Sequence, residues 1–293
     1  MATSTPISRI SMPRTAFPAL ILANVVLAMG PVLVRLTDVG PVAAAFWRLT
    51  LAMPVLGLLA LPGLRAARLR GGQWAMMLGA GLFFAADLAS WHVGIGHTKI
   101  ANATLFGNVS ALALPLWGVI VLRQRLYRTQ AIALMLAGVG AAILMGGSYE
   151  LSPRNLSGDL FCLLAGLLYT AYLLMIQDAR RGLDSWSVLA TASLAGTVPL
   201  LAAAMMLGER ILPANWTPLV MLALSSQLVG QGLLTYAING VSPLVLGLSL
   251  LVQPVVSAVV GWWLFGELLT PVDLAGAAAV AAALILVRLP GRA

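Results

Sequence analysis

The sequence is poor in the residues on which soluble enzymes depend. Its 293 residues include one cysteine, two histidines and nine acidic residues, and charged residues make up 9% of the chain. Soluble domains average about 25% charged and about 45 to 50% apolar residues, whereas 60% of this chain is apolar. This composition excludes a soluble globular protein.

The scarcity of reactive side chains excludes several chemistries. Lys99, the single lysine, follows Thr98 and no glycine-rich run, so the chain has no P-loop for ATP. His92 and His97 are five residues apart, and no acidic residue lies three or four positions from them in a metal-binding pattern. The lone Cys162 provides no disulfide framework. We therefore predict no catalytic residues, no metal and no cofactor.

What the chain has in quantity is long apolar runs. About 20 apolar residues in a helix span a bilayer, and ten such runs are bounded by charged residues, proline or glycine. They lack the alternation of barrel strands, so the sequence predicts an all-α polytopic membrane protein with ten transmembrane helices. The predicted spans are 17–35, 42–61, 73–93, 100–121, 130–146, 158–177, 186–207, 216–236, 241–264 and 272–288.

The arginines predict the orientation of these spans. Of the 17 basic residues, 12 fall in the two termini and alternate loops, four in the remaining loops, and Arg48 within a helix. The positive-inside rule then places both termini in the cytoplasm. Arg9 and Arg14 precede a run too long for a signal peptide, which we interpret as a retained first span. The net charge of +8 is scattered, which predicts a lipid bilayer and no nucleic acid as partner.

The two halves of the chain resemble each other. Pro115 stands 23 residues before Gly138, and Pro254 stands 22 residues before Gly276. Five helices in each half force the halves to insert in opposite orientations, and such inverted repeats are typical of secondary transporters. The predicted organisation is a cytoplasmic tail over 1–16, a first repeat over 17–146, a periplasmic linker over 147–157, a second repeat over 158–288 and a cytoplasmic tail over 289–293.

Three segments carry a resemblance to a known family: FWRLTLA (46–52), GIGHTKIANATLF (94–106) and QPVVSAVVGWWLFGELLTPVDLAG (253–276). On these the chain resembles the EamA family of the drug/metabolite transporter (DMT) superfamily. The most specific piece is Pro254 followed by GWWLFGE and a glycine nine residues later. The first half departs from the pattern at Arg128, near where the repeat would place a glutamate, which weakens any role for that loop.

Within the family, the best match is to bacterial aromatic amino-acid exporters of the YddG type. The resemblance implies a multi-pass protein of the inner membrane that exports aromatic or broadly neutral amino acids. Alternating access would take place at a site near mid-depth between the halves. The alternative is an exporter of another amphipathic metabolite or drug with the same fold. Coupling to protons and uncoupled facilitation both stay open.

Two other classes of function are weaker alternatives. An intramembrane enzyme would need a nucleophile and a base, for which the segment Gly247-Leu248-Ser249-Leu250 and His92 are the sole candidates. A signalling or scaffold role is disfavoured because the short loops leave little surface outside the membrane.

Arg48 and Asp87 are charged residues within predicted membrane spans. A charged side chain at such depth costs about 2.5 to 3.5 kcal/mol on insertion scales. Both lie about six residues from the outer end of their helices, so we expect them to pair. The pair would either fix the packing of the helices or bind the carboxylate and amine of a zwitterion.

Polar residues recur every four positions along two predicted spans. Gln227, Gln231, Thr235 and Asn239 follow one helix face, and Ser249, Gln253 and Ser257 follow another. Such stripes either line a water-filled cavity or bond neighbouring helices together. We predict a cavity because glutamine is large and two glutamines lie on one stripe.

Further cavity candidates cluster near the middle of the chain. Trp91 shares a helix face with Asp87 and is either an aromatic anchor at the membrane surface or a stacking platform for an aromatic substrate. His92 is a hydrogen-bond donor or proton carrier. Weaker candidates, each able to bond a nearby backbone instead, are Asn24, Asn102, Asn108, Tyr169 and Tyr172.

Prolines and small residues predict where helices break and pack. Gly30 and Pro31 should break the first span, and Pro115, Pro199 and Pro254 should kink or break theirs, each with a static kink as the alternative. Alanines recur every four residues in 130–146 and 272–288, which favours close packing within one chain over a dimer.

Overall fold

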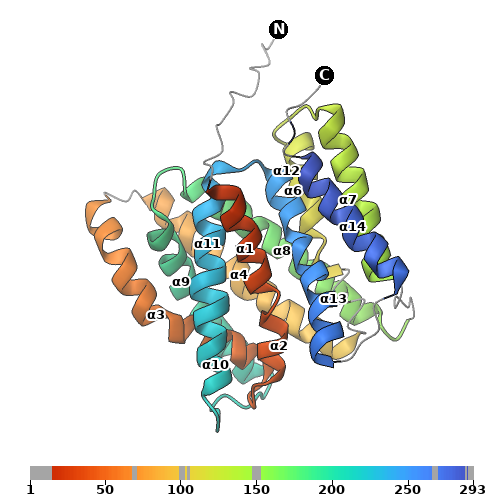
Figure 1. Cartoon of the computed structure of the whole chain (residues 1–293). Coiled ribbons are helices and arrows are strands. Elements are labelled where there is room, and N and C mark those ends of the chain that lie inside the picture. Colours follow the sequence, from red (N-terminus) through yellow and green to blue (C-terminus); the bar gives the residue numbers. More distant parts are fainter. Residues whose placement is uncertain are drawn as a thin grey trace.

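A computed structural model describes residues 15–67, 71–98, 103, 106–146, 153–265, 270–287 and 289. Over these residues the chain forms a bundle of helices, and no strand occurs among them (Figure 1). The expectations for Arg9, Arg14, Lys99, Asn102 and Glu267 concern residues outside this described part.

Six helical segments of the first half have bounds within the described residues. They are α1 (Ala16–Leu27), α2 (Gly30–Arg35), α3 (Pro41–Ala66), α4 (Gly71–His97), α6 (Ser110–Ile120) and α7 (Arg128–Gly146). The span predicted over 100–121 is therefore described as helix α6 over Ser110–Ile120, and Asn108 lies in the turn before it.

The described residues of the second half form nine segments, several of which continue one another. They are α8 (Leu156–Ala179), α9 (Ser185–Met206), α10 (Thr217–Leu222), η1 (Ala223–Gly230), α11 (Gln231–Ala237), η2 (Ile238–Gly240), α12 (Pro243–Leu250), α13 (Val252–Phe265) and α14 (Pro271–Leu286).

The described segments confirm the predicted number of helices. Counting α1 with α2, α10 through η2 as one, and α12 with α13 gives ten helices. In this count helix 1 is α1 with α2, helix 8 is α10 through η2, and helix 9 is α12 with α13. Seven of these are long and apolar enough to cross a membrane, and three shorter apolar helices are Ser110–Ile120, Arg128–Ile143 and Pro271–Leu286.

Successive helices run in opposite directions, so the bundle has two ends (Figure 1). We call the end where α1 begins and α14 ends the terminal end, and the other the far end. Arginines at the terminal end are Arg65, Arg123, Arg125, Arg128, Arg180 and Arg181. Those at the far end are Arg35, Arg154 and Arg210. The described loops thus alternate in charge as predicted.

Two of the predicted helix breaks lie near the middle of the bundle. α1 ends at Leu27 and α2 begins at Gly30, with Pro31 in its first turn. α12 ends at Leu250 and α13 begins at Val252. Pro254 has no N–H to donate to the carbonyl of Leu250, four residues earlier, which accounts for the break at that point.

The expected breaks at Pro115 and Pro199 are absent. Pro115 lies inside the continuous helix α6, and Pro199 lies inside α9. Pro115 instead makes a packing contact, because a Cβ at Gly247 of α12 would lie 2.5 Å from its Cδ. Its missing hydrogen bond is tolerated where another helix approaches this closely.

Helix 8 contains a feature that the sequence did not predict. Its middle segment, η1, is a π-helix of eight residues between α10 and α11. Its hydrogen bonds run from i to i+5, so the helix is wider here and each residue turns by a smaller angle than in an α-helix. Side chains before and after η1 therefore do not follow a single α-helical stripe.

The helices pack in pairs that involve both halves of the chain. α4 packs on α8 and α9, α3 packs on α9 and η1, and α1 packs on η1 and α11. Close approach requires glycine at Gly81 of α4, where a Cβ would lie 2.3 Å from the carbonyl oxygen of Ala192 on α9.

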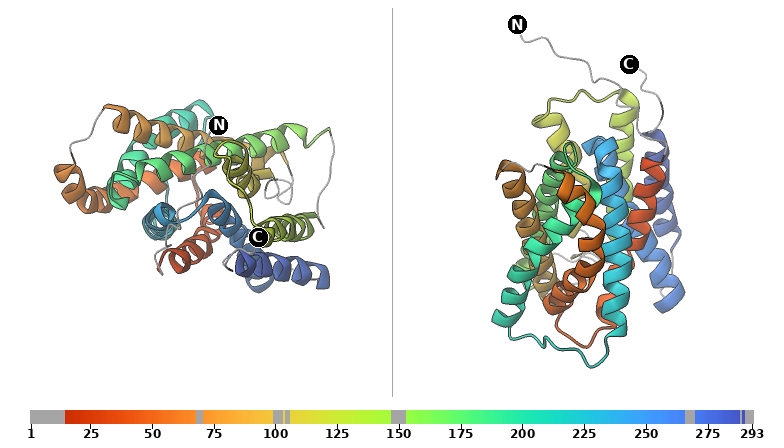
Figure 2. Two further views of the ribbon diagram at one scale, coloured as in Figure 1. Left: turned by 90° about the horizontal axis from the view of Figure 1, so that it is seen from above. Right: turned by 90° about the vertical axis from the view of Figure 1, so that its left-hand side faces the viewer.

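α7 and α14 form a separate pair at one side of the bundle, away from α3 (Figure 2). A Cβ at Gly140 would lie 2.8 Å from the carbonyl oxygen of Gly276, so the two backbones approach closely. Ala133 and Ala137 of α7 and Ala283 of α14 are fully buried. The alanine stripes thus lie at a contact within the chain.

The loop before α10 holds the far end of α3. Gly40, at the start of α3, has no side chain to cap the helix, and Glu209 supplies a carboxylate in its place. Its oxygens accept from the N–H groups of Val42 (3.2 Å) and Ala43 (2.7 Å). Trp47 Nε1 donates to the carbonyl oxygen of Ile211 (2.7 Å) and fixes the same loop.

Candidate functional site

A cavity of about 170 Å³ lies in the bundle between its middle and its far end. It is built where α1 breaks and where α3, α4, α8, α11 and α13 converge. Its polar and aromatic lining comes from Arg48, Phe84, Asp87, Trp91, His92, Asn108, Ser110, Tyr169, Gln231 and Gln253. Gly30 and Pro31 lie in its wall, so the break of helix 1 opens space for it.

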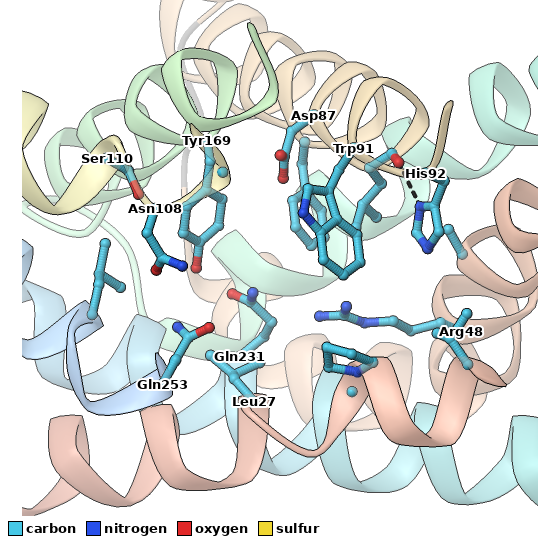
Figure 3. A pocket seen from close by; sticks show the side chains of 18 of the residues that line it. Leu27, Arg48, Asp87, Trp91, His92, Asn108, Ser110, Tyr169, Gln231 and Gln253 are labelled. Atoms are coloured by element: carbon cyan, nitrogen blue, oxygen red, sulfur yellow. Dashed lines mark hydrogen bonds between the residues drawn. The ribbon is translucent and has the colours of Figure 1, made fainter. Parts of the chain in front are cut away.

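Arg48 reaches into this cavity from α3 (Figure 3). Its Nε donates to Gln227 Oε1 (3.1 Å), and its guanidinium carbon lies 5.6 Å from the centroid of the Phe84 ring. A guanidinium placed over an aromatic face is stabilised by the ring quadrupole. Among the described residues, neither terminal amino group of Arg48 has a hydrogen-bond acceptor.

The prediction that Arg48 and Asp87 form an ion pair is wrong. Both line the cavity, but no ion pair within 4.0 Å joins them. Gln227 and Phe84 fix the guanidinium, while Asp87 projects from α4 on another side of the cavity (Figure 3). Asp87 accepts no hydrogen bond from the described residues. The two charges therefore face the same space without neutralising each other by contact.

His92 lies beside Trp91 on α4 and is 8% exposed. Its Nδ1 lies 2.5 Å from the carbonyl oxygen of Leu88, which can only accept, so Nδ1 carries the proton. In the neutral ring Nε2 is then an acceptor, and it has no hydrogen-bond partner among the described residues. From the sequence we expected a hydrogen-bond donor or a proton carrier at this position. In the neutral ring Nδ1 donates to the backbone, and Nε2 is the nitrogen available to a ligand.

Aromatic rings form one side of the cavity. Phe84 stacks on Tyr172 with ring centroids 4.5 Å apart, and Tyr172 stacks on Tyr169 at 5.7 Å. Trp91 meets the ring of His92 edge-on at 5.2 Å. Gly107 makes room for the indole, because a Cβ there would lie 3.0 Å from its Nε1. Trp91 thus belongs to the cavity wall.

The polar stripe of helix 8 divides at the π-helix. Gln231 lines the cavity and accepts from the Tyr172 hydroxyl (3.2 Å), whereas Gln227 lies behind Arg48 and outside the cavity lining. Thr235 is buried and Asn239 is exposed. The prediction of one cavity-lining stripe is wrong, because Gln231 is the one member of the four that lines the cavity. The π-helix η1 turns Gln227 away from the direction of Gln231.

The polar residues of helix 9 bond to helix 1 near the break in helix 9. Gln253 lines the cavity and donates from Nε2 to Asn24 Oδ1 (2.8 Å). Asn24 in turn donates to Ser249 Oγ (3.3 Å), and both of these side chains are fully buried. Ser257 is exposed. Ser249 therefore joins helices and does not line the cavity.

Some residues of the site were not identified from the sequence. Phe84 precedes Asp87 by three positions on one helix, so its spacing could have indicated it. Ser193 accepts a hydrogen bond from Gln227 Nε2 (2.8 Å) and is 1% exposed. No sequence signal identified Ser193, because its role depends on which helix packs against η1.

Hydrogen bonds join helices between the cavity and the terminal end. Gln177 Nε2 on α8 donates to the carbonyl oxygens of Ile238 (3.2 Å) and Val241 (2.8 Å). Arg180 Nε donates to the carbonyl oxygen of Thr235 (3.0 Å). The hydroxyls of Thr15 and Tyr236 are 2.9 Å apart. We call these contacts the terminal seal.

Comparison with known proteins identifies the class of protein that this bundle represents. The model of the EamA-like transporter family matches the chain twice, over residues 15–146 and 156–289. The chain belongs to the EamA-like transporter family, and it is therefore a membrane transporter.

Similar sequences and structures agree with this assignment. An uncharacterized transporter of Archaeoglobus fulgidus is 24% identical over 180 residues, and this match covers 60% of this chain and 61% of the relative. A second uncharacterized transporter of that organism is 24% identical over 211 residues, covering 72% and 75%. A crystal structure of a protein superposes with a TM-score of 0.81 at 17% identity, covering 95% of this chain and 98% of that one, and shares its fold.

Proposed function

We propose that this chain is a secondary transporter that exports amino acids, aromatic and broadly neutral, across the bacterial inner membrane. The observation that carries the proposal is that Arg48 and Asp87 face one cavity without an ion pair between them. Unpaired charges within a membrane are costly and mark substrate pathways. A zwitterion satisfies both, because its carboxylate binds Arg48 and its ammonium group binds Asp87.

The remaining lining supports an aromatic or apolar side chain on the substrate. Trp91 and Tyr169 offer aromatic surface beside the two charges, and Phe84, which contacts Arg48 and Tyr172, completes the aromatic wall. Binding pockets of this kind combine apolar walls with a few polar groups that fix orientation. The volume of about 170 Å³ suits a small metabolite more than a drug-sized ligand, for which pockets begin near 300 Å³.

Alternating access is the mechanism we propose. The family model matches twice, once in each half. Helices at equivalent positions in the two halves contact each other, because α6 contacts α12 and α7 contacts α14. We propose that the halves are inverted repeats and that both termini are cytoplasmic. The described state then has its cavity toward the outside and its terminal seal closed toward the cytoplasm, and rocking of the halves reverses this.

Uptake into proteoliposomes tests the proposal. We expect saturable uptake of radiolabelled phenylalanine and tryptophan, with threonine and lysine measured alongside, each with and without a pH gradient. Uptake without a gradient indicates a facilitator, and uptake only with one indicates proton coupling. If none of the four amino acids enters under either condition, the amino-acid assignment is wrong and another amphipathic metabolite or drug is the cargo.

A further inference from the structure

The guanidinium of Arg48 is bound from one side only. Nε donates to Gln227 Oε1, and the face of the guanidinium lies over Phe84. The terminal amino groups have no acceptor among the described residues and line the cavity with the rest of the side chain. A planar guanidinium binds a carboxylate best through two parallel N–H bonds, and these donors are the ones left free.

Gln227 is held in a single orientation. It is fully buried, and Arg48 Nε can only donate, so the amide must turn its oxygen toward Arg48. The amide nitrogen then donates to Ser193 Oγ on α9 (2.8 Å). The flipped amide would place its N–H groups against the N–H of Arg48 Nε and lose the bond to Arg48. These hydrogen bonds, from Gln227 to Ser193 and from Arg48 to Gln227, thus link α9, η1 and α3.

The π-helix accounts for the direction of Gln227. Gln227 lies within η1, and Gln231 is the first residue of α11. The wider turn separates the directions of these two side chains, so Gln231 lines the cavity while Gln227 meets Arg48 from behind. π-helical segments occur frequently at functional sites.

From this geometry we infer that Gln227, held by Ser193, is a positioning residue that presents the terminal amino groups of Arg48 to the carboxylate of the substrate. The inference rests on the proposed function and adds a residue that does not itself contact the substrate. It implies that replacing Gln227 weakens the binding of ligands that have a carboxylate. Binding of analogues in which an uncharged group replaces the carboxylate should not change.

Binding of matched ligands to the full chain in lipid nanodiscs tests this inference. The probes are phenylalanine, phenylalaninamide, which lacks the carboxylate, and 3-phenylpropionate, which lacks the amine. In Gln227→Met, which keeps length but has no acceptor, we expect phenylalanine affinity to fall about tenfold and phenylalaninamide affinity to change less than twofold. Ser193→Ala should produce a smaller loss in the same direction.

Two further variants separate positioning from a structural role. Gln227→Glu keeps the acceptor and adds a negative charge beside Arg48, so it should reduce phenylalanine affinity at least as much as Gln227→Met. Thr191→Val is the control for Ser193→Ala, because Thr191 lies two residues away on α9 and bonds the carbonyl oxygen of Ser187. Equal losses for phenylalanine and phenylalaninamide in the Gln227 variants would overturn the inference.

The wild-type protein distinguishes failure of the inference from failure of the proposed function. If it binds 3-phenylpropionate but no amino acid, the amino-acid assignment fails, and the Gln227 variants test positioning with that carboxylate instead. If it binds neither carboxylate, the inference is overturned. If Gln227→Met does not fold, the Ser193→Ala variant tests the inference, because it removes one hydroxyl and leaves the amide of Gln227 in place.

Discussion

Arg48 and Asp87 give the cavity its chemical character at the scale of single residues. Each would destabilise a membrane helix if it lay against lipid, and each is instead directed into one enclosed space. Their separation leaves both available to a ligand, whereas a direct ion pair would have offered no free charge.

Replacing Arg48 by lysine should damage transport although the charge is kept. Lysine has no Nε–H equivalent to bond Gln227 and no fork for a carboxylate, so the apparent KM for amino acids should rise about tenfold or more. Uptake kinetics in proteoliposomes measure this. Arg35→Lys, at an exposed position of the far end, is the matched control and should transport normally. Unchanged kinetics in Arg48→Lys would argue against carboxylate binding at this position.

His92 should distinguish substrates by their hydrogen-bond donors. Nε2 is an acceptor in the cavity wall to which no described residue donates, and an indole N–H or a hydroxyl of a substrate can donate to it. In His92→Phe, tryptophan uptake should fall about fivefold relative to phenylalanine, since a neutral hydrogen bond contributes about 1 kcal/mol. Competition between the two labelled amino acids gives the ratio directly. A ratio equal to that of the wild type would exclude His92 from recognition.

At the scale of helices, the sequence predicted features that depend on one residue and missed those that depend on helix rotation. Pro254 and Gly30-Pro31 mark real breaks because a missing N–H acts locally. Pro115 does not break α6, because Gly247 of another helix packs against it. The direction of Gln227 depends on the π-helix, and helical stripes drawn at a constant angle per residue do not reveal it.

The start of α3 should lose stability when Glu209 is replaced. The Glu209 carboxylate accepts from two N–H groups of a helix whose own first residue has no capping side chain. Glu209→Ala should lower the free energy of unfolding by about 1 to 2 kcal/mol. Thermal unfolding in detergent measures it. Asp178→Ala removes an exposed ion pair with Arg181 and should have an effect below about 1 kcal/mol; equal effects would contradict a capping role.

For the whole molecule, the sequence predicted the number of helices and the alternation of loop charge, because both follow from composition along the chain. It also predicted several residues that meet in the cavity, such as Trp91, Tyr169 and Gln253. It did not predict that Arg48 and Asp87 would stay apart, because their separation depends on how α3 and α4 rotate against η1 and α8. Polar residues within membrane spans therefore predict which residues form a site, but they do not predict which of those residues contact one another.

The terminal seal should control which end of the bundle is open. Gln177 donates to two carbonyl oxygens at the end of helix 8, so Gln177→Leu removes two bonds that the described state has. The opposite state should gain population, by about fivefold if the net loss is about 1 kcal/mol. In a Cys162→Ser background, the modification rate of Val34→Cys, in the cavity wall, by an impermeant thiol reagent should then fall. A rate that rises or stays constant would contradict this role of the seal.

The contact between Glu209 and α3 also affects how the chain is assembled. Glu209 follows Val42 by 167 residues. Ribosomes add about 5 to 20 residues per second, so α3 waits about 10 to 30 s after its synthesis before its capping carboxylate exists. During that interval its first N–H groups at the far end rely on water or lipid headgroups. The third helical segment to be made is therefore completed only after α8 and α9 of the second half have been translated.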